Sequence, residues 1–220
     1  PPRSTLFPYT TLFRSRMGLN INMKLEKAGY YPKGGGHFYV EIEPVDSISP
    51  LEILNREQLS ELELKVIFTK LPSNIIDREI EIAEKKINEV LRKNRMGVEI
   101  KKEVREYISS APGNMIFLKA RFGDCYAGFS SLGERGKPAE KVVSELVESF
   151  DSYLRSNQPI DTHLADQILV PLSFSKKTSK YSVSEVSQHL LTNAQILSMF
   201  SGREIEISGK ENEQGTVFVK

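Results

Sequence analysis

The chain has 220 residues, of which 39% are hydrophobic and 27% charged, a composition of ordinary globular proteins that allows one large domain or two smaller ones. The 30 Lys and Arg residues balance 29 Asp and Glu residues, so the net charge of +1 excludes a strong bulk attraction for nucleic acid or an anionic membrane. A single cysteine, Cys125, excludes an internal disulfide framework, and no apolar run reaches the roughly 18 to 20 residues that span a bilayer. We therefore expect a soluble, cytoplasmic protein with no membrane contact, in which any RNA contact is local.

The first residues have the sequence of a cloning or sequencing artefact. The stretch "TLFPYTTLFRS", residues 5–15, reads codon for codon as the translation of a widely used sequencing adapter. A mature N-terminal segment or a degenerate targeting peptide is the alternative, but a match over eleven codons is too specific for chance. We assign residues 1–16 to a non-native, adapter-derived segment and expect the native protein to continue upstream of Met17.

A glycine-rich turn precedes the first expected strand. Residues 34–36 are three glycines, and residues 37–43 then alternate apolar and polar side chains up to Pro44. The lysine lies before the glycines and no helix follows them, so neither the P-loop nor the dinucleotide-binding pattern is met. We expect a sharp turn that leads into a half-buried strand, with Phe38, Val40 and Ile42 on its buried side.

The segment from about residue 50 to residue 156 has the pattern of a compact α+β block. Its two expected helices repeat apolar side chains at helical spacing, and Gly123 with Asp124 suits a tight hairpin turn. In chain order the expected elements are a strand at 62–68, a helix at 73–95, strands at 98–104, 115–122 and 125–129, and a helix at 138–154. The apolar stripes are Ile76, Ile80, Ala83, Ile87 and Leu91 in the first helix and Val142, Leu146 and Phe150 in the second. Such a block can close its own core, with residues 155–161 as the linker that leaves it.

The last segment returns to a mixed pattern. It predicts a helix at 162–174, a strand at 180–183, a helix that carries His189 and ends near 200, and strands at 203–208 and 215–220. Together with the strand at 37–43 these elements form an α+β layer. The sequence therefore predicts an α+β fold in which residues 17–49 and 157–220 form one domain and residues 50–156 are inserted into it.

The helix at 162–174 presents three polar side chains together. His163, Asp166 and Gln167 lie on one side at i, i+3 and i+4, opposite an apolar face, and Pro171 is expected to bend the helix near its end. On spacing alone these side chains could be a metal pair, a nucleotide contact or a solvated face, and the solvated face is the simplest interpretation. The apolar face consists of Leu164, Ile168 and Leu172.

His189 lies in the first one or two turns of its helix. Ser187, Ser184, or Ser182 with Glu185 could cap that helix. A helix N-terminus carries partial positive charge and free N–H groups, which attract phosphate and favour the neutral imidazole that a nucleophile must be. Asn193, one turn on, could orient the ring. Periodicity alone favours a capping or half-buried histidine; the apolar stripe of this helix is Val186, Leu190, Ala194 and Leu197.

Five segments together resemble the RNA 3′-terminal phosphate cyclase family. They are "GYYPKGGG", "SAPGN", "LGERGKPAEKV", "HLADQILVPL" and "QHLLTN", and the resemblance covers Met17 to Lys220 in the order and approximate spacing of that family. The segments "HLADQ" and "HLLTN" are the most specific. A high content of Lys, Glu and Ile is typical of an archaeal or thermophilic source.

The resemblance implies a fold and an activity. The family has a large catalytic domain of repeated α+β units like the C-terminal domain of translation initiation factor three, with a thioredoxin-like domain inserted in the last unit. Its members use ATP and a divalent metal, Mg²⁺ or Mn²⁺, to convert an RNA 3′-phosphate into a 2′,3′-cyclic phosphate through a covalent histidine-AMP. By this resemblance His189 is the nucleophile, the ring of His163 stacks on adenine, and Asp166 and Gln167 lie near the nucleotide. No metal ligand is assigned.

The resemblance also implies that part of the family's chain is absent here, and other functions remain as alternatives to it. The N-terminal repeats of the family are missing, so we expect the parent protein to be the enzyme and this chain to be inactive or nearly so. A non-catalytic relative that acts in ribosome biogenesis lacks the catalytic histidine, so the presence of His189 argues against that alternative. An enolpyruvate-type transferase or a stand-alone RNA-binding module are further alternatives, and the sequence gives no oligomeric state.

Overall fold

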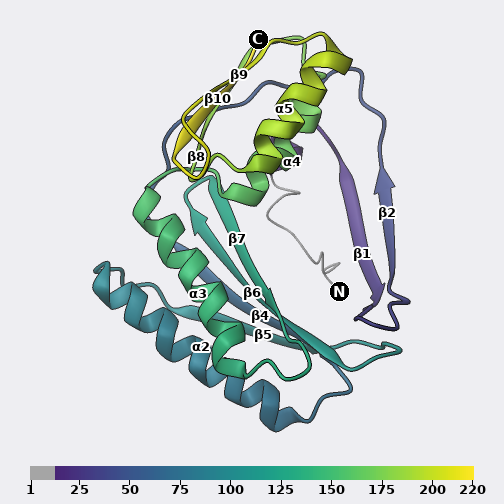
Figure 1. Ribbon diagram of the computed structural model, residues 1–220, viewed down its shortest axis with the longest axis vertical. Coiled ribbons are helices and arrows are strands. Elements are labelled where there is room, and N and C mark those ends of the chain that lie inside the picture. The colour runs from purple at the N-terminus through teal and green to yellow at the C-terminus, as the bar shows by residue number, and fades with distance from the viewer. Residues whose placement is uncertain (1–12) are drawn as a thin grey trace.

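Three β-sheets and the helices α2 to α5 organise the part of the chain that the computed structural model describes, residues 13–220 (Figure 1). The adapter-derived assignment of residues 1–16 falls mostly outside the described residues. Within them, Phe13 and Met17 are fully buried in the hydrophobic core. The mixture of helices and several sheets agrees with the expected α+β class.

A two-stranded ribbon leads the described chain. Strands β1 (Ile21–Lys27) and β2 (His37–Ile42) pair with each other in antiparallel register and with no other strand of the described residues. All six residues of β2 are exposed, with Phe38 at 64% and Ile42 at 63%. The expectation of a half-buried strand is wrong for this chain, because alternation marks an apolar face but does not supply the layer that covers it.

The C-terminal sheet is built from both ends of the sequence. Its strand order is β3-β8-β10-β9, in which β3 runs parallel to β8 and the other pairs are antiparallel. Helices α4 and α5 pack together against this sheet (Figure 1). The elements are β3 (Glu52–Ile53), α4 (Thr162–Leu172), β8 (Ser179–Val183), α5 (Gln188–Ser201), β9 (Ile205–Ser208) and β10 (Gly215–Val219).

The middle block lies in the chain between β3 and α4. Its sheet has the order β5-β4-β6-β7, with β4 and β5 parallel and the other neighbours antiparallel, and α2 and α3 cover one face of it (Figure 1). The elements are β4 (Glu61–Thr69), α2 (Ser73–Lys93), β5 (Ile100–Glu106), β6 (Gly113–Phe122), β7 (Cys125–Leu132) and α3 (Ala139–Ser156). The expected boundary at residue 50 lies beside β3, whose two residues pair with β8.

The helices of the middle block bury the apolar stripes that the sequence predicts, with one addition. Four of the five predicted α2 residues are buried and Ile80 is partly buried, but Glu79 is buried as well, at 2% exposure. Its carboxylate accepts a hydrogen bond of 2.5 Å from the Asn114 side chain on β6. A buried carboxyl needs such a partner, so β6 and α2 are joined by a polar contact inside the core.

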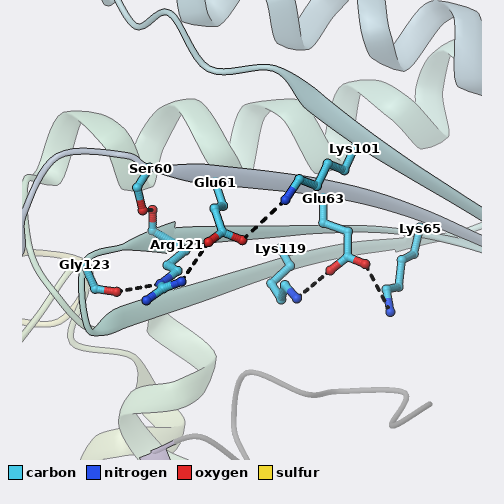
Figure 2. Close-up of polar contacts among 8 residues, drawn as sticks. All are labelled: Ser60, Glu61, Glu63, Lys65, Lys101, Lys119, Arg121 and Gly123. Atoms are coloured by element: carbon cyan, nitrogen blue, oxygen red, sulfur yellow. Dashed lines mark hydrogen bonds and ion pairs between the residues drawn. The ribbon is translucent and has the colours of Figure 1, made fainter. Parts of the chain in front are cut away.

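The other face of the middle sheet carries paired charges (Figure 2). Glu63 lies between Lys119 at 2.5 Å and Lys65 at 3.5 Å, and Glu61 contacts Arg121 at 2.7 Å. Burial raises the pKa of Glu63, but Lys119 and Lys65 outweigh it, so this pKa lies below its ordinary value. Acids and bases thus lie opposite one another on neighbouring strands, and their attraction joins the strands across this face.

The helices and strands otherwise follow the sequence closely. Each predicted helix and strand is present with ends displaced by a few residues, and Pro171 lies inside α4. Strands β1 and β3 were not predicted. No helix within residues 13–220 combines the length and the hydropathy that a bilayer crossing requires, and the cytoplasmic location stays a prediction.

Candidate functional site

The N-terminal ends of α4 and α5 lie next to each other. The residues that lead into them form a parallel bridge between Ile160 and Val183, and the Ser184 amide donates to the Ile160 carbonyl at 2.8 Å. The hydroxyls of Thr162 and Ser184 are 3.4 Å apart. Two helix N-termini therefore meet at one edge of the C-terminal sheet, where their partial positive charges and free N–H groups favour an anionic ligand.

Asp161 fixes the start of α4. Its carboxylate accepts hydrogen bonds from the amides of His163 at 3.0 Å and Leu164 at 2.9 Å, which satisfies two free donors of the first turn. Burial raises the pKa of Asp161 to about 6, although both amides, the charge of His163 and the nearby Gly128 amide on β7 oppose the increase. Its second oxygen, Oδ2, has no partner with hydrogen-bond geometry within residues 13–220. Asp161 thus positions His163 in the first turn.

Ser187 performs the same role for α5. Its hydroxyl accepts a hydrogen bond from the Leu190 amide at 3.2 Å, so of the caps considered from the sequence Ser187 is the one that closes this helix. His189 is then the second helical residue and its side chain is exposed. No hydrogen bond joins His189 to Asn193 in the described part of the chain, so the expected orientation of the ring by Asn193 has no support here.

Asp166 connects the two helices electrostatically. Burial raises the pKa of its carboxyl, and the charges of His189 on α5 and His163 on α4 lower it in part. Such an effect requires both imidazoles to be near the same carboxylate. The structure therefore places three of the residues singled out in the sequence, His163, Asp166 and His189, within electrostatic range of one another. Gln167 is exposed on α4 directly after Asp166, and no side-chain contact joins it to the other three within residues 13–220.

A buried tyrosine on the C-terminal sheet holds α4 in place. Tyr181 on β8 is fully buried, and its hydroxyl donates to the Ala165 carbonyl of α4 at 2.9 Å. Neither Asp161 nor Tyr181 was predicted from the sequence to support the site. For Asp161 a signal existed, because an aspartate directly before a helix is a typical N-cap. For Tyr181 no such signal existed in the sequence, because its partner Ala165 lies on another element, α4.

The described residues contain no ready-made metal centre. No group of three or more His, Cys, Asp or Glu side chains in residues 13–220 is arranged to hold a metal ion. The sequence assigned no metal ligand either. ATP and a divalent metal remain predictions.

Comparison with known proteins decides the family. The family model described as RNA 3′-terminal phosphate cyclase matches residues 3–207. The chain belongs to the RNA 3′-terminal phosphate cyclase family. The match begins inside the segment assigned to an adapter, and that assignment stays a prediction.

Curated cyclases of several organisms are similar along the whole chain. The RNA 3′-terminal phosphate cyclase of Gloeothece citriformis is 32% identical over 220 residues, which are 100% of this chain and 60% of that protein. The cyclase of Thermococcus gammatolerans is 32% identical over 219 residues and that of Thermococcus kodakarensis 31%, each covering 62% of the relative. The relatives include archaeal ones, as the composition suggested. The chain thus spans about three-fifths of the length of these cyclases.

Proposed function

We propose that this chain is the C-terminal part of an enzyme that uses ATP to convert an RNA 3′-terminal phosphate into a 2′,3′-cyclic phosphate. The proposal is carried by His189, an exposed imidazole in the first turn of α5, with the carboxylate of Asp166 and the N-terminus of α4 beside it. Family membership supports the same reaction class. No other class considered from the sequence requires a histidine in this environment.

The reaction proceeds in three displacements. An imidazole nitrogen of His189 attacks the α-phosphorus of ATP; an N–P bond forms, the bond to the bridging oxygen breaks, and pyrophosphate leaves. An oxygen of the RNA 3′-phosphate then attacks the same phosphorus and releases the imidazole. Finally the 2′-hydroxyl attacks the activated 3′-phosphorus, loses its proton and displaces AMP. The covalent step divides one difficult displacement into easier ones, because AMP is a far better leaving group than a phosphomonoester oxygen.

The residues of the site have distinct roles in this proposal. The N-terminal ends of α4 and α5 direct N–H groups and partial positive charge at the phosphates, which stabilises the charge that develops there. The Asp166 carboxylate lies near His189 and stabilises the positive charge that the ring gains when it attacks. His163 stacks on the adenine ring, and Gln167 contacts the nucleotide.

ATP is a substrate in this scheme, and a divalent metal would accompany its phosphates. Mg²⁺ usually keeps several waters and binds through substrate phosphates with one or two carboxylates, so the reaction does not require a dedicated cluster of protein ligands. The metal would neutralise the triphosphate and help pyrophosphate depart. In this chain Asp166 is the acid whose pKa responds to the charges of both His189 and His163.

The fold supports a chain that lacks part of its catalytic domain. We interpret β3-α4-β8-α5-β9-β10 as one βαβαββ unit of the kind found in the C-terminal domain of initiation factor three, with the middle block as a thioredoxin-like insert between β3 and α4. The β1–β2 ribbon then corresponds to the last two strands of a preceding unit. Further repeats would cover two apolar surfaces of this chain. One carries Phe38 and Ile42 on the ribbon, and the other carries Met199 and Phe200 on α5, whose side chains are 83% and 87% exposed. We accordingly expect this chain alone to be inactive or nearly so.

The proposal is tested by restoring the upstream reading frame. The extended protein, incubated with ATP labelled at the α-phosphate and Mg²⁺, should acquire an acid-labile label that His189→Ala abolishes. His37→Ala is the matched control, because His37 is an exposed histidine on β2 and should leave labelling unchanged. Absence of a His189-dependent adduct in a folded, extended protein would favour the non-catalytic relative of this family instead.

A further inference from the structure

Two sequence motifs that the proposed reaction does not use lie against each other. The glycine-rich turn between β1 and β2 contacts the loop between β5 and β6, where the motif "SAPGN" begins before it continues into β6 (Figure 1). The Ala28 amide donates to the Ile108 carbonyl at 3.1 Å, and Ala28 and Ser109 form a parallel bridge. The turn of the ribbon is thereby fixed on the middle block.

Polar groups from these two segments approach each other at Gly35. Gly34 and Gly35 have φ values of 58° and 72°, a left-handed conformation that glycine adopts without strain. A Cβ atom on Gly35 would lie 3.6 Å from the Ser110 hydroxyl and 3.9 Å from the Lys27 ammonium. An exposed backbone segment, a hydroxyl and an ammonium group therefore surround the same point.

The polar groups around this point have no partners within residues 13–220. Lys27 makes no ion pair, and neither the Ser110 hydroxyl nor the Gly35 amide makes a hydrogen bond. The neighbouring acid, Glu26, is already occupied by His37 at 2.7 Å and Lys24 at 3.7 Å. The ammonium of Lys27, a partly buried residue, and the Ser110 hydroxyl lie beside Gly35, and such donors suit a phosphate oxygen.

We infer that Lys27, Ser110 and Gly35 form a cradle for a backbone phosphate of single-stranded RNA, with Tyr31 as a stacking platform for an adjacent base. Tyr31 belongs to the same turn and is 96% exposed. An aromatic ring stabilises a protein mainly when it is buried, so a ligand that covers this ring would be favoured. Aromatic rings beside basic groups are how proteins bind single strands without reading their sequence. A free phosphate ion would need only the three donors; the exposed ring favours RNA. The choice of RNA rests on the proposed function.

Binding of RNA to the 220-residue chain tests this inference directly. The ligand is a single-stranded RNA of about ten nucleotides with a 3′-hydroxyl, which is not a substrate of the proposed reaction. In the isotope-labelled wild-type chain, the amide signals of Gly35 and Ser110 should shift on addition of RNA. No ATP is present, so the result is independent of adenylylation at His189.

Three variants separate the parts of the cradle. Lys27→Met should weaken RNA binding about tenfold and reduce the slope of log affinity against log salt by about 0.7, the value for one lost contact to a single strand. Tyr31→Ala should weaken binding about tenfold with the salt slope unchanged. Lys24→Met is the matched control, because Lys24 lies on the same strand but is paired with Glu26, and it should leave both quantities unchanged.

Several outcomes would overturn the inference. One is unshifted Gly35 and Ser110 signals at millimolar RNA. Another is an equal loss of affinity in Lys27→Met and Lys24→Met, which would indicate general electrostatic attraction. A shift with inorganic phosphate but none with RNA would make this a site for small anions and exclude the RNA strand. Far-UV circular dichroism of each variant verifies that the fold is unchanged.

Discussion

Asp161 and Asp166 lie close together in the chain, and the different burial of their side chains gives them different roles. Asp161 is 3% exposed and accepts two backbone amides at the start of α4, whereas Asp166 is only partly buried and lies near both imidazoles. The first carboxyl positions a helix, and the second is available to the chemistry of the site. Both have raised pKa values for the same main cause, which is burial.

The Asp161 carboxyl should make folding stability depend on pH. Its pKa is about 6 in the folded chain against an ordinary value of 3.8, so between these values the folded state holds more protons than the unfolded state. The contribution of Asp161 to stability is therefore fully present below pH 3.8 and is lost as the pH rises through 6. Asp161→Asn keeps an N-cap acceptor without the charge and should remove a decrease on the order of 2 kcal/mol. Urea unfolding of both proteins at several pH values measures it; parallel pH profiles would contradict it.

At the scale of elements, the middle block is joined by one buried polar contact as well as by its apolar core. Glu79 of α2 and Asn114 of β6 are 2% and 4% exposed, and their hydrogen bond links the helix to the central part of the sheet. Burial raises the pKa of Glu79, while Asn114 and the charge of Lys137 oppose the increase. A contact of this kind specifies how the helix is placed along the sheet, since a displaced helix would leave a buried carboxyl unpaired.

Removal of Asn114 should expose this dependence. Asn114→Ala leaves Glu79 without its side-chain donor and should cost about 2 kcal/mol of the free energy of unfolding. The loss should be larger at neutral pH than in acid, because the ionised carboxylate needs the donor most. Asn88→Ala is the control, since Asn88 is exposed on the same helix and its carbonyl, not its side chain, accepts from Arg92. Equal effects of both substitutions in chemical denaturation would refute the explanation.

At the scale of the whole molecule, one cluster of side chains contacts both segments that connect the middle block to the C-terminal sheet. The Arg56 guanidinium, in the segment after β3, lies 4.3 Å from the Phe122 ring centre and 4.2 Å from that of Tyr153. It donates to the Leu154 carbonyl at 3.0 Å, at the end of α3. The Tyr153 hydroxyl in turn donates to the Pro159 carbonyl at 3.0 Å, in the segment that leads to α4.

This connection predicts that a change at Arg56 reaches the candidate site. Arg56→Lys replaces a planar group between two rings by an ammonium and should lower the free energy of unfolding by about 1 to 2 kcal/mol. Because α4 begins three residues after Pro159, the nuclear magnetic resonance signals of the His163 ring should shift. The chain has only 3 histidines, so each ring is resolved and His37 on β2 serves as an internal reference that should not move.

Arg121→Lys provides the matched control for this effect. Arg121 also lies over an aromatic ring, that of Tyr126 at 5.6 Å, and it pairs with Glu61 on the open face of the middle sheet (Figure 2). Its replacement should leave the His163 signals in place. If Arg56→Lys lowers stability while the His163 ring is unaffected, the cluster stabilises the middle block and does not position α4.

Much of the fold could be predicted because its elements are specified locally. The stripe of α2 and the Gly123 hairpin follow from the positions of apolar residues and glycine, and both are present. Strand β3 could not be predicted, because two residues carry no periodicity and form a strand only by pairing with β8 more than a hundred residues later. Glu79 was missed for a similar reason, since a charged residue at a core position is intelligible only with Asn114 opposite it.

The sequence by itself determined that His163 and His189 lie in the first turns of two helices, because capping residues and apolar spacing act over a few neighbouring residues. Only the tertiary structure decided that these turns meet around Asp166, that the apolar side of β2 is exposed, and that Lys27 faces Ser110 across Gly35. Those relations join segments that are distant in the chain. They depend on how sheets and helices pack, and no short-range pattern contains that information.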